Sequence, residues 1–210
     1  MGQPVRRRPQ QRSLETREKL VDAALEVFAA RGFDGATTRT IAERAGVALA
    51  ALPYHFETKE ALWRAAAERI FGLLRQHFAA SPSDAASGEE LRDMLREFVR
   101  FAAHHPELHR FMLQEGTGAS ARLAWLVEKH VRPHFELLRG VLARAQRQGL
   151  APKGRPEHLF YALIGAASMP YAVAPEFRRL TGDDPSDEAL VEAHVEFLFQ
   201  LFFSRRGRAA

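Results

Sequence analysis

Two pairs of histidines have the residue type and spacing that could bind a metal ion. His105 and His109 are four residues apart, as are His130 and His134, and residues four apart share one face of a helix. Imidazole pairs of this kind bind zinc or nickel. However, a proline lies inside each pair, the chain has no cysteine, and no obvious acidic third ligand accompanies either pair. We therefore expect no metal ion.

The residue patterns of common enzyme classes are also missing. The sequence has no glycine-rich phosphate loop, no serine in a nucleophile elbow and no set of metal ligands. His104 and His105 with nearby acidic residues are too generic to nominate an acid–base pair. The absence of cysteine excludes thiol catalysis and disulfides and fits a reducing compartment. We expect a protein that is not an enzyme and uses no cofactor.

The segment 37–56 has instead the spacing of a helix-turn-helix, a motif that binds DNA. Ala42 is small enough to let two helices approach closely, and Gly46 can adopt the left-handed conformation that ends a helix. An apolar seam between the helices is supplied by Ile41, Ala45, Val47 and Leu52. The second helix of such a motif enters the major groove.

Helices on both sides of the motif complete a compact unit. Ser13 can cap a first helix that stops at Gly32, Thr37 or Thr38 can cap the second, and Thr58 can cap a fourth. Apolar residues recur at helical spacing in the first of these segments. The predicted helices of this part are 13–31, 37–46, 49–54 and 58–78.

The run from Thr16 to Leu62 resembles the N-terminal domain of TetR-family (TetR/AcrR-type) transcriptional regulators. The matching positions, without gaps, are Ala24, Phe28, Gly32, Phe33, Thr37, Thr38, Ile41, Ala42, Gly46, Val47, Tyr54, His55, Phe56, Lys59, Glu60 and Leu62. The rest of the chain resembles the family mainly in its length and helical pattern. The resemblance implies an all-α protein with an N-terminal helix-turn-helix domain and a C-terminal ligand-binding and dimerisation domain.

The same resemblance suggests which residues touch DNA. It makes Arg39 a candidate base contact and Thr38, Tyr54, His55 and Lys59 candidate phosphate contacts. A simpler interpretation exists for three of them. Arg39 could be a solvated charge, and Tyr54 and His55 could serve chiefly to pack the motif.

The recognition helix departs from the family pattern at Pro53 and Ala48. Members often have tyrosine where this chain has Pro53, and proline is tolerated only in the first turn of a helix. Ala48 stands where a serine or threonine cap is usual. We therefore expect this helix to be short, distorted or late in starting. Leu49, Ala50 and Ala51 then present small apolar side chains, which can touch thymine methyl groups but offer no hydrogen bonds to bases.

Positive charge is concentrated at the N-terminus. Residues 1–12 carry four arginines and no acidic residue in a chain of net charge +4, so we expect a disordered basic arm that lies along phosphates or in the minor groove. A solvated tail is the alternative. The tail 205–210 is interpreted as a solvated end. Without an apolar run of membrane-spanning length or a signal peptide, the protein is expected in the cytoplasm.

The remainder of the chain predicts a second helical domain. Our domain division is 13–60 for DNA binding and 61–204 for effector binding and dimerisation, with about nine helices in all. Pro133 and Pro170 are expected to kink their helices. The helices predicted here are 89–104, 106–115, 119–148, 156–174 and 187–203.

The last two of these helices indicate a homodimer. Both 156–174 and 187–203 are apolar on more than one face, which favours a surface shared with a partner over the core of so small a domain. We expect a two-fold dimer that presents two recognition helices to double-stranded DNA at a palindromic operator. The alternative is an ordinary monomer core.

Aromatic, methionine and histidine side chains are plentiful in this domain. In the family such residues commonly line a cavity for a small molecule, whose binding lowers operator affinity through linkage, although each of them could also be simple core. The candidates for this unknown effector are Phe101, His105, Phe111, Met112, Trp125, His130, His134, Tyr161 and Met169. The resulting hypothesis is a ligand-responsive repressor, with an architectural DNA-binding protein or an activator as alternatives.

Overall fold

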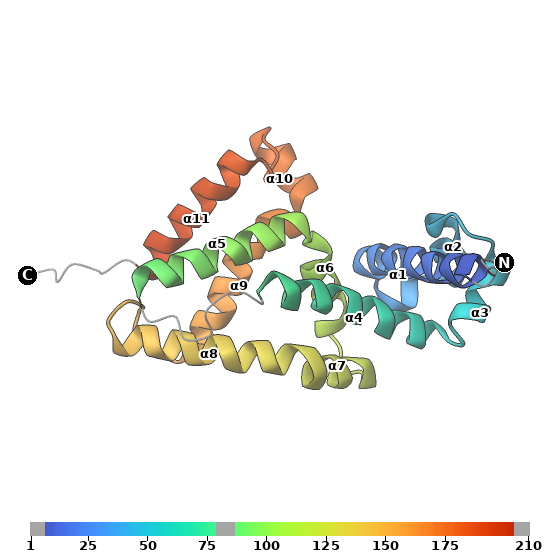
Figure 1. Ribbon diagram of the computed structural model, residues 1–210. Coiled ribbons are helices and arrows are strands. Elements are labelled where there is room, and N and C mark those ends of the chain that lie inside the picture. Colours follow the sequence, from blue (N-terminus) through green and yellow to red (C-terminus); the bar gives the residue numbers. More distant parts are fainter. Residues whose placement is uncertain (1–6, 79–86, 204–210) are drawn as a thin grey trace, which may run out of the picture. The chain divides into compact units, whose positions relative to one another are not determined.

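The computed structural model describes residues 7–78 and 87–203, and all regular structure within them is helical (Figure 1). The all-α prediction is therefore confirmed for this part of the chain. The described residues form two compact units, one made of 7–73 with 110–120 and the other of 74–109 with 121–203. The division between the units falls within α4, and the functional division after residue 60 stays a prediction.

The first unit contains α1 (Arg7–Gly35), α2 (Thr38–Ala45), α3 (Leu52–His55) and most of α4 (Lys59–His77). Because α1 begins at Arg7, residues 7–12 are helical, and the prediction of a disordered arm is wrong for them. Residues 1–6 lie outside the described part. The second half of α6 (Pro106–Gly116) also belongs to this unit.

The core of the first unit is closed by large side chains from α1, α4 and α6. Phe28 and Trp63 are both buried, and the Trp63 ring stacks on Phe111 at 5.3 Å between centroids. The predicted stop at Gly32 appears as a break in the helical dihedrals, with φ 69° and ψ 177°. A Cβ at this position would lie 2.9 Å from Oε1 of Gln114, so the glycine also permits the approach of α6.

The second unit contains α5 (Gly88–His104), α7 (Ala121–Leu126), α8 (Arg132–Arg147), α9 (Pro156–Ala172), α10 (Ala174–Thr181) and α11 (Glu188–Phe203). The predicted helices of this region are confirmed to within a few residues, with two exceptions. The sequence missed α10 altogether. It also treated 119–148 as one helix, whereas a π-helical turn, Val127–Val131, separates α7 from α8.

Helices α5, α9 and α11 share one apolar core. Residues at helical spacing on each of them are buried, among them Val99, Leu163 and Val195. Ser87 begins α5 with a capping box: its hydroxyl accepts from the Glu90 amide and the Glu90 carboxylate accepts from the Ser87 amide. These local signals explain why this helix starts where it does.

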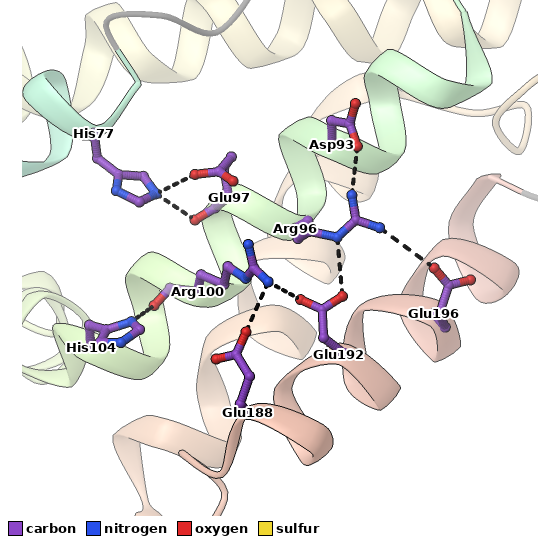
Figure 2. A network of polar contacts seen from close by, with 9 residues as sticks. All are labelled: His77, Asp93, Arg96, Glu97, Arg100, His104, Glu188, Glu192 and Glu196. Carbon is purple, nitrogen blue, oxygen red and sulfur yellow. Dashed lines mark hydrogen bonds and ion pairs between the residues drawn. The ribbon is translucent and has the colours of Figure 1, made fainter.

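A ladder of ion pairs joins α5 to α11 beside this core (Figure 2). Arg96 Nε lies 3.1 Å from Glu192, and Arg100 Nη2 lies 2.8 Å from both Glu188 and Glu192. The arginines and the glutamates each recur every fourth residue, so each set occupies one face of its helix. The ladder therefore runs along the side of α11 that faces α5.

Pro133 and Pro170, the two prolines that were predicted to kink their helices, both lie within helical structure. Pro133 lies in the first turn of α8, after the π turn in which the Arg132 amide donates to the Val127 carbonyl. Pro170 lies inside α9 and cannot donate to the Ala166 carbonyl. His194 of α11 supplies the missing donor, with Nε2 at 3.1 Å from that oxygen.

No helix in the described residues is long and apolar enough to cross a membrane.

Candidate nucleic-acid interface

Local hydrogen bonds set both ends of α2. The Thr37 hydroxyl accepts from the Thr40 amide at 3.1 Å, which caps the first turn as predicted. At the other end Gly46 adopts φ 66°, and the Val47 amide donates to the Ala42 carbonyl at 3.0 Å. This left-handed termination turns the chain sharply toward the next helix.

The recognition segment after this turn is short and irregular. It begins as a 3-10 turn, Leu49–Ala51, and continues as the four-residue α3 with Pro53 in its first turn. Ala48 provides no side-chain cap. The expectation drawn from Pro53 and Ala48 is thus confirmed. Leu52 is buried and anchors the segment, whereas Leu49, Ala50 and Tyr54 are exposed.

Arg39 lies in the first turn of α2 with its side chain exposed. Within the described residues it forms no ion pair or hydrogen bond. Three other arginines of this unit form ion pairs: Arg44 with Glu26, Arg64 with Glu60 and Arg69 with Asp22. An exposed guanidinium without an internal partner is able to make a bidentate contact with guanine or phosphate.

The other candidate contacts surround α3. Tyr54 is 82% exposed, and its ring meets His55 edge-on at 5.2 Å. Lys59, at the start of α4, holds its ammonium 4.5 Å from the centroid of Phe33. Thr38 is the first residue of α2. The predicted DNA contacts thus lie on the helix-turn-helix and at the start of the helix after it. They are Thr38, Arg39, Leu49, Ala50, Ala51, Tyr54, His55 and Lys59, and their contact with DNA stays a prediction.

Sequence reasoning missed Arg17 of α1. Its guanidinium lies 4.9 Å from the centroid of Phe56, the residue that ends α3. A cation held over an aromatic ring is restrained near the recognition segment. The contact joins residues 39 positions apart, so no local sequence signal could have revealed it.

In the second unit, four of the predicted effector residues fall into two groups, each joined by aromatic contacts. In the first group the ring centroids of Phe101 and His105 lie 4.7 Å apart, and the Phe101 ring also contacts the His77 ring. In the other group Trp125 meets His130 edge-on at 5.2 Å, and Arg75 Nη1 lies 3.4 Å from His130 Nδ1. His134 is tied to this group because its Nδ1 donates to the His130 carbonyl at 2.6 Å.

His109 adjoins the first group and was not among the effector residues predicted. Its ring meets Phe98 edge-on at 5.7 Å. Burial lowers the pKa of His109 to about 4, because the imidazolium would lose its hydration. The ring is therefore neutral at physiological pH.

The remaining predicted effector residues lie elsewhere. Phe111 and Met112 belong to the first unit, where Phe111 stacks on Trp63. Tyr161 and Met169 are exposed on α9. Within the second unit, no ring contact or hydrogen bond among the described residues joins Tyr161 or Met169 to the two groups above. In the described part of the chain, no three histidine, aspartate or glutamate side chains are placed to hold a metal ion.

Exposed apolar side chains form a stripe on each of α9 and α11. On α9 the stripe includes Tyr161 and Met169, and on α11 it includes Phe197 and Leu201. Small residues on the same two helices are also exposed, namely Ala162, Ala189 and Ala193. We call these residues the α9/α11 stripe.

A capped helix, a left-handed turn and a short second helix, with the exposed guanidinium of Arg39 on the first of them, define a helix-turn-helix DNA-binding protein. Two family models match the chain: bacterial regulatory proteins of the tetR family over residues 20–66, and the tetracyclin repressor-like C-terminal domain over residues 88–201. The chain therefore belongs to the tetR family of bacterial regulatory proteins, which are DNA-binding transcriptional regulators.

Individual relatives agree with this assignment. The chain is 26% identical over 187 residues to the HTH-type transcriptional regulator RutR of Escherichia coli K12, covering 88% of each protein. Its fold is similar to that of AibR in complex with isovaleryl coenzyme A and operator DNA, with TM-score 0.72, 17% identity, and coverage of 90% of this chain and 98% of AibR. A TetR-like transcriptional regulator from Rhodococcus sp. RHA1 gives TM-score 0.62 and 23% identity, covering 89% and 92% of the two chains. At such identities the structural likeness concerns the fold alone.

Proposed function

We propose that this chain is a homodimeric repressor that binds a palindromic operator through α2 and α3 and is released by a small molecule bound in its second unit. The observation that supports operator binding best is the exposed Arg39, which has no ion pair or hydrogen bond within the described residues, in the first turn of α2 of the helix-turn-helix. Repression requires only that the protein occupy a promoter, whereas activation requires a polymerase contact that no feature identifies. Such a regulator acts on DNA in the cytoplasm.

The α9/α11 stripe supports the dimer. Exposed Phe, Leu, Tyr and Met side chains on two neighbouring helices are unfavourable in water and mark an association surface. The exposed alanines of the same helices allow helices of two protomers to approach closely. A two-fold axis through this surface presents two copies of α3 to the two halves of a palindrome.

The aromatic and histidine groups of the second unit support an effector. Phe101 with His105, and Trp125 with His130, offer flat apolar faces with polar edges, which suit a partly apolar small molecule. AibR, which shares the fold, is known in complex with both isovaleryl coenzyme A and operator DNA. An effector that prefers the non-binding conformation lowers operator affinity by its difference in affinity for the two states.

The test is fluorescence anisotropy of labelled DNA from upstream of the protein's own gene. Wild-type protein is expected to bind in the presence of competitor DNA, and Arg39→Ala is expected to weaken binding by about 1–3 kcal/mol. The matched control is Arg64→Ala, because Arg64 is also exposed in this unit but pairs with Glu60 on α4. If the affinity depends neither on the DNA sequence nor on Arg39, the alternative of an architectural protein is favoured.

A further inference from the structure

The recognition segment is unusual in the chemistry it exposes. From Ala48 to Pro53 six consecutive residues carry no side-chain atom that donates or accepts a hydrogen bond. They cover the whole 3-10 turn and the first two residues of α3, and Pro53 also lacks a backbone N–H. Direct readout by hydrogen bonds is therefore impossible for the side chains of this stretch.

The stretch is nevertheless open to solvent where a DNA groove is expected. Leu49 is 43% exposed and Ala48, Ala50 and Pro53 are exposed, while Leu52 is the one buried residue of these six. The exposed side chains thus form a continuous apolar face, here called the 48–53 face. Hydrogen-bonding groups reappear only at its end, at Tyr54 and His55.

The major groove offers one apolar group to such a face. Adenine, guanine and cytosine edges present only donors and acceptors there, and thymine adds its C5-methyl group. Placing an alanine or leucine side chain against a donor or acceptor removes that group's water without replacing the hydrogen bond, which is unfavourable. Placing it against a methyl group buries apolar surface on both sides, which is favourable.

We propose that the 48–53 face reads thymine methyl groups, and that base hydrogen bonding is left to Arg39 of α2. This inference rests on the proposed function, because it assumes that α3 enters the major groove of an operator. Sequence preference then comes from the positions of methyl groups under Leu49 and Ala50. A half-site suited to this chain carries thymines at the base pairs that α3 covers.

The experiment selects operators from random duplex DNA with the full-length protein and then removes methyl groups one position at a time. Each thymine of the selected palindrome is replaced by deoxyuridine in both half-sites, which changes only the methyl. Burial of one methyl is worth about fourfold in affinity, so the symmetric replacement is expected to weaken binding about fifteenfold at positions under the face. Replacing the same thymine by 5-methylcytosine should weaken binding less than replacing it by cytosine.

Protein variants show whether the 48–53 face makes the contact. Leu49→Ala is expected to lose most of the difference between thymine and deoxyuridine at one position, and Ala50→Gly at another. Leu113→Ala is the control, since Leu113 is an exposed leucine of α6 in the same unit but outside the motif. Two variants are used because part of the Leu49 side chain packs within the protein, so that Leu49→Ala can also affect folding, whereas Ala50 is exposed.

Each outcome decides between the two proposals. Affinity that falls with methyl removal, and does so less in Leu49→Ala or Ala50→Gly, supports methyl readout. If an operator is selected but its affinity is unchanged by deoxyuridine, methyl readout is overturned, whereas the proposed function as an operator-binding regulator stands. A methyl effect that both variants retain assigns the contact to another part of the protein. If no sequence is enriched, the proposed operator function fails together with the inference.

Discussion

Gly32 is the residue at which the backbone of the first unit depends most on glycine. Its φ of 69° with ψ of 177° is accessible almost only to glycine, and an added Cβ would also meet Gln114. Gly32→Ala is therefore expected to destabilise the first unit by about 1–3 kcal/mol. Urea unfolding followed by Trp63 fluorescence in a Trp125→Phe background measures this unit alone.

Gly140 is the matched control for Gly32. It lies within α8, and a Cβ there would meet no atom within 4 Å. Gly140→Ala should stabilise the second unit by about 0.5–1 kcal/mol, because alanine loses less backbone entropy in a helix. Equal effects of the two substitutions would mean that the backbone at Gly32 imposes no special requirement.

His109 predicts how stability depends on pH. Its pKa in the folded protein is lowered to about 4 from 6.5, so between these values the unfolded chain binds a proton that the folded chain does not. The contribution of His109 to the free energy of unfolding should therefore be fully present above pH 6.5. Between pH 6.5 and pH 4 the free energy of unfolding should fall by about 3 kcal/mol. Below pH 4 this group should cause no further change. Burial also lowers the pKa of His194, which acts in the same direction.

The measurement is the free energy of unfolding between neutral and mildly acid pH. His109→Asn removes the titrating group and should flatten the decline. His104→Asn, at an exposed position of α5, is the control and should keep the wild-type profile. An unchanged profile in His109→Asn would assign the acid sensitivity to other groups.

At the scale of elements, the ladder between α5 and α11 holds two helices far apart in the sequence in one register. Arg96 contacts Asp93, Glu192 and Glu196, and is only partly exposed. Arg96→Met is expected to cost about 1 kcal/mol, and a double-mutant cycle with Glu192→Gln should show coupling of similar size, decreasing with added salt. Arg139→Met, which breaks an exposed pair within α8, should cost less.

Thermal or urea unfolding at low and high salt measures both substitutions. If the cycle shows no coupling at low salt, the ladder contributes nothing to the packing of α11 on α5, and the apolar core alone sets the register.

The elements predicted well from the sequence are those whose ends are set by near neighbours. Thr37, Gly46 and Thr58 each act on amides or carbonyls within a few residues, so their effect follows from the local sequence. The shortness of α3 followed from Pro53 by the same reasoning. Local signals of this kind in residues 37–56, together with the flanking helices, were enough to predict the helix-turn-helix.

Other elements depend on partners far along the chain. The sequence missed α10, whose first turn holds Pro175 and follows α9 after the single non-helical residue Val173. No side-chain cap marks the start of α10, and only Pro175, which suits the first turn of a helix, is a local signal for it. The pairing of Arg17 with Phe56 and of His194 with Ala166 follows only from the packing of whole helices.

At the scale of the whole molecule, the helical extension of α1 changes what the basic N-terminus can do. Because the helix already begins at Arg7, Arg12 is carried on a rigid helix. Phosphate contacts from a rigid helix require less ordering on binding than contacts from a flexible arm. Such contacts are insensitive to sequence and appear in the salt dependence of affinity.

The last prediction concerns assembly. Phe197 is 60% exposed in the middle of the α9/α11 stripe. Phe197→Glu places a charge in the proposed interface, where burying it without a partner is costly, and should yield a monomer. A monomer engages one half-site at a time and loses the effective concentration of the second, so operator affinity should fall by about 10²–10⁴.

Leu180→Glu is the matched control, because Leu180 is 78% exposed on α10 and lies outside the stripe. Sedimentation velocity gives the mass of each variant, and anisotropy with full palindromes and isolated half-sites gives affinity. Phe197→Glu should bind a half-site as tightly as wild type while losing its preference for the palindrome. If it remains a dimer with full operator affinity, the two protomers meet through another surface, and the pairing of recognition helices must be sought there.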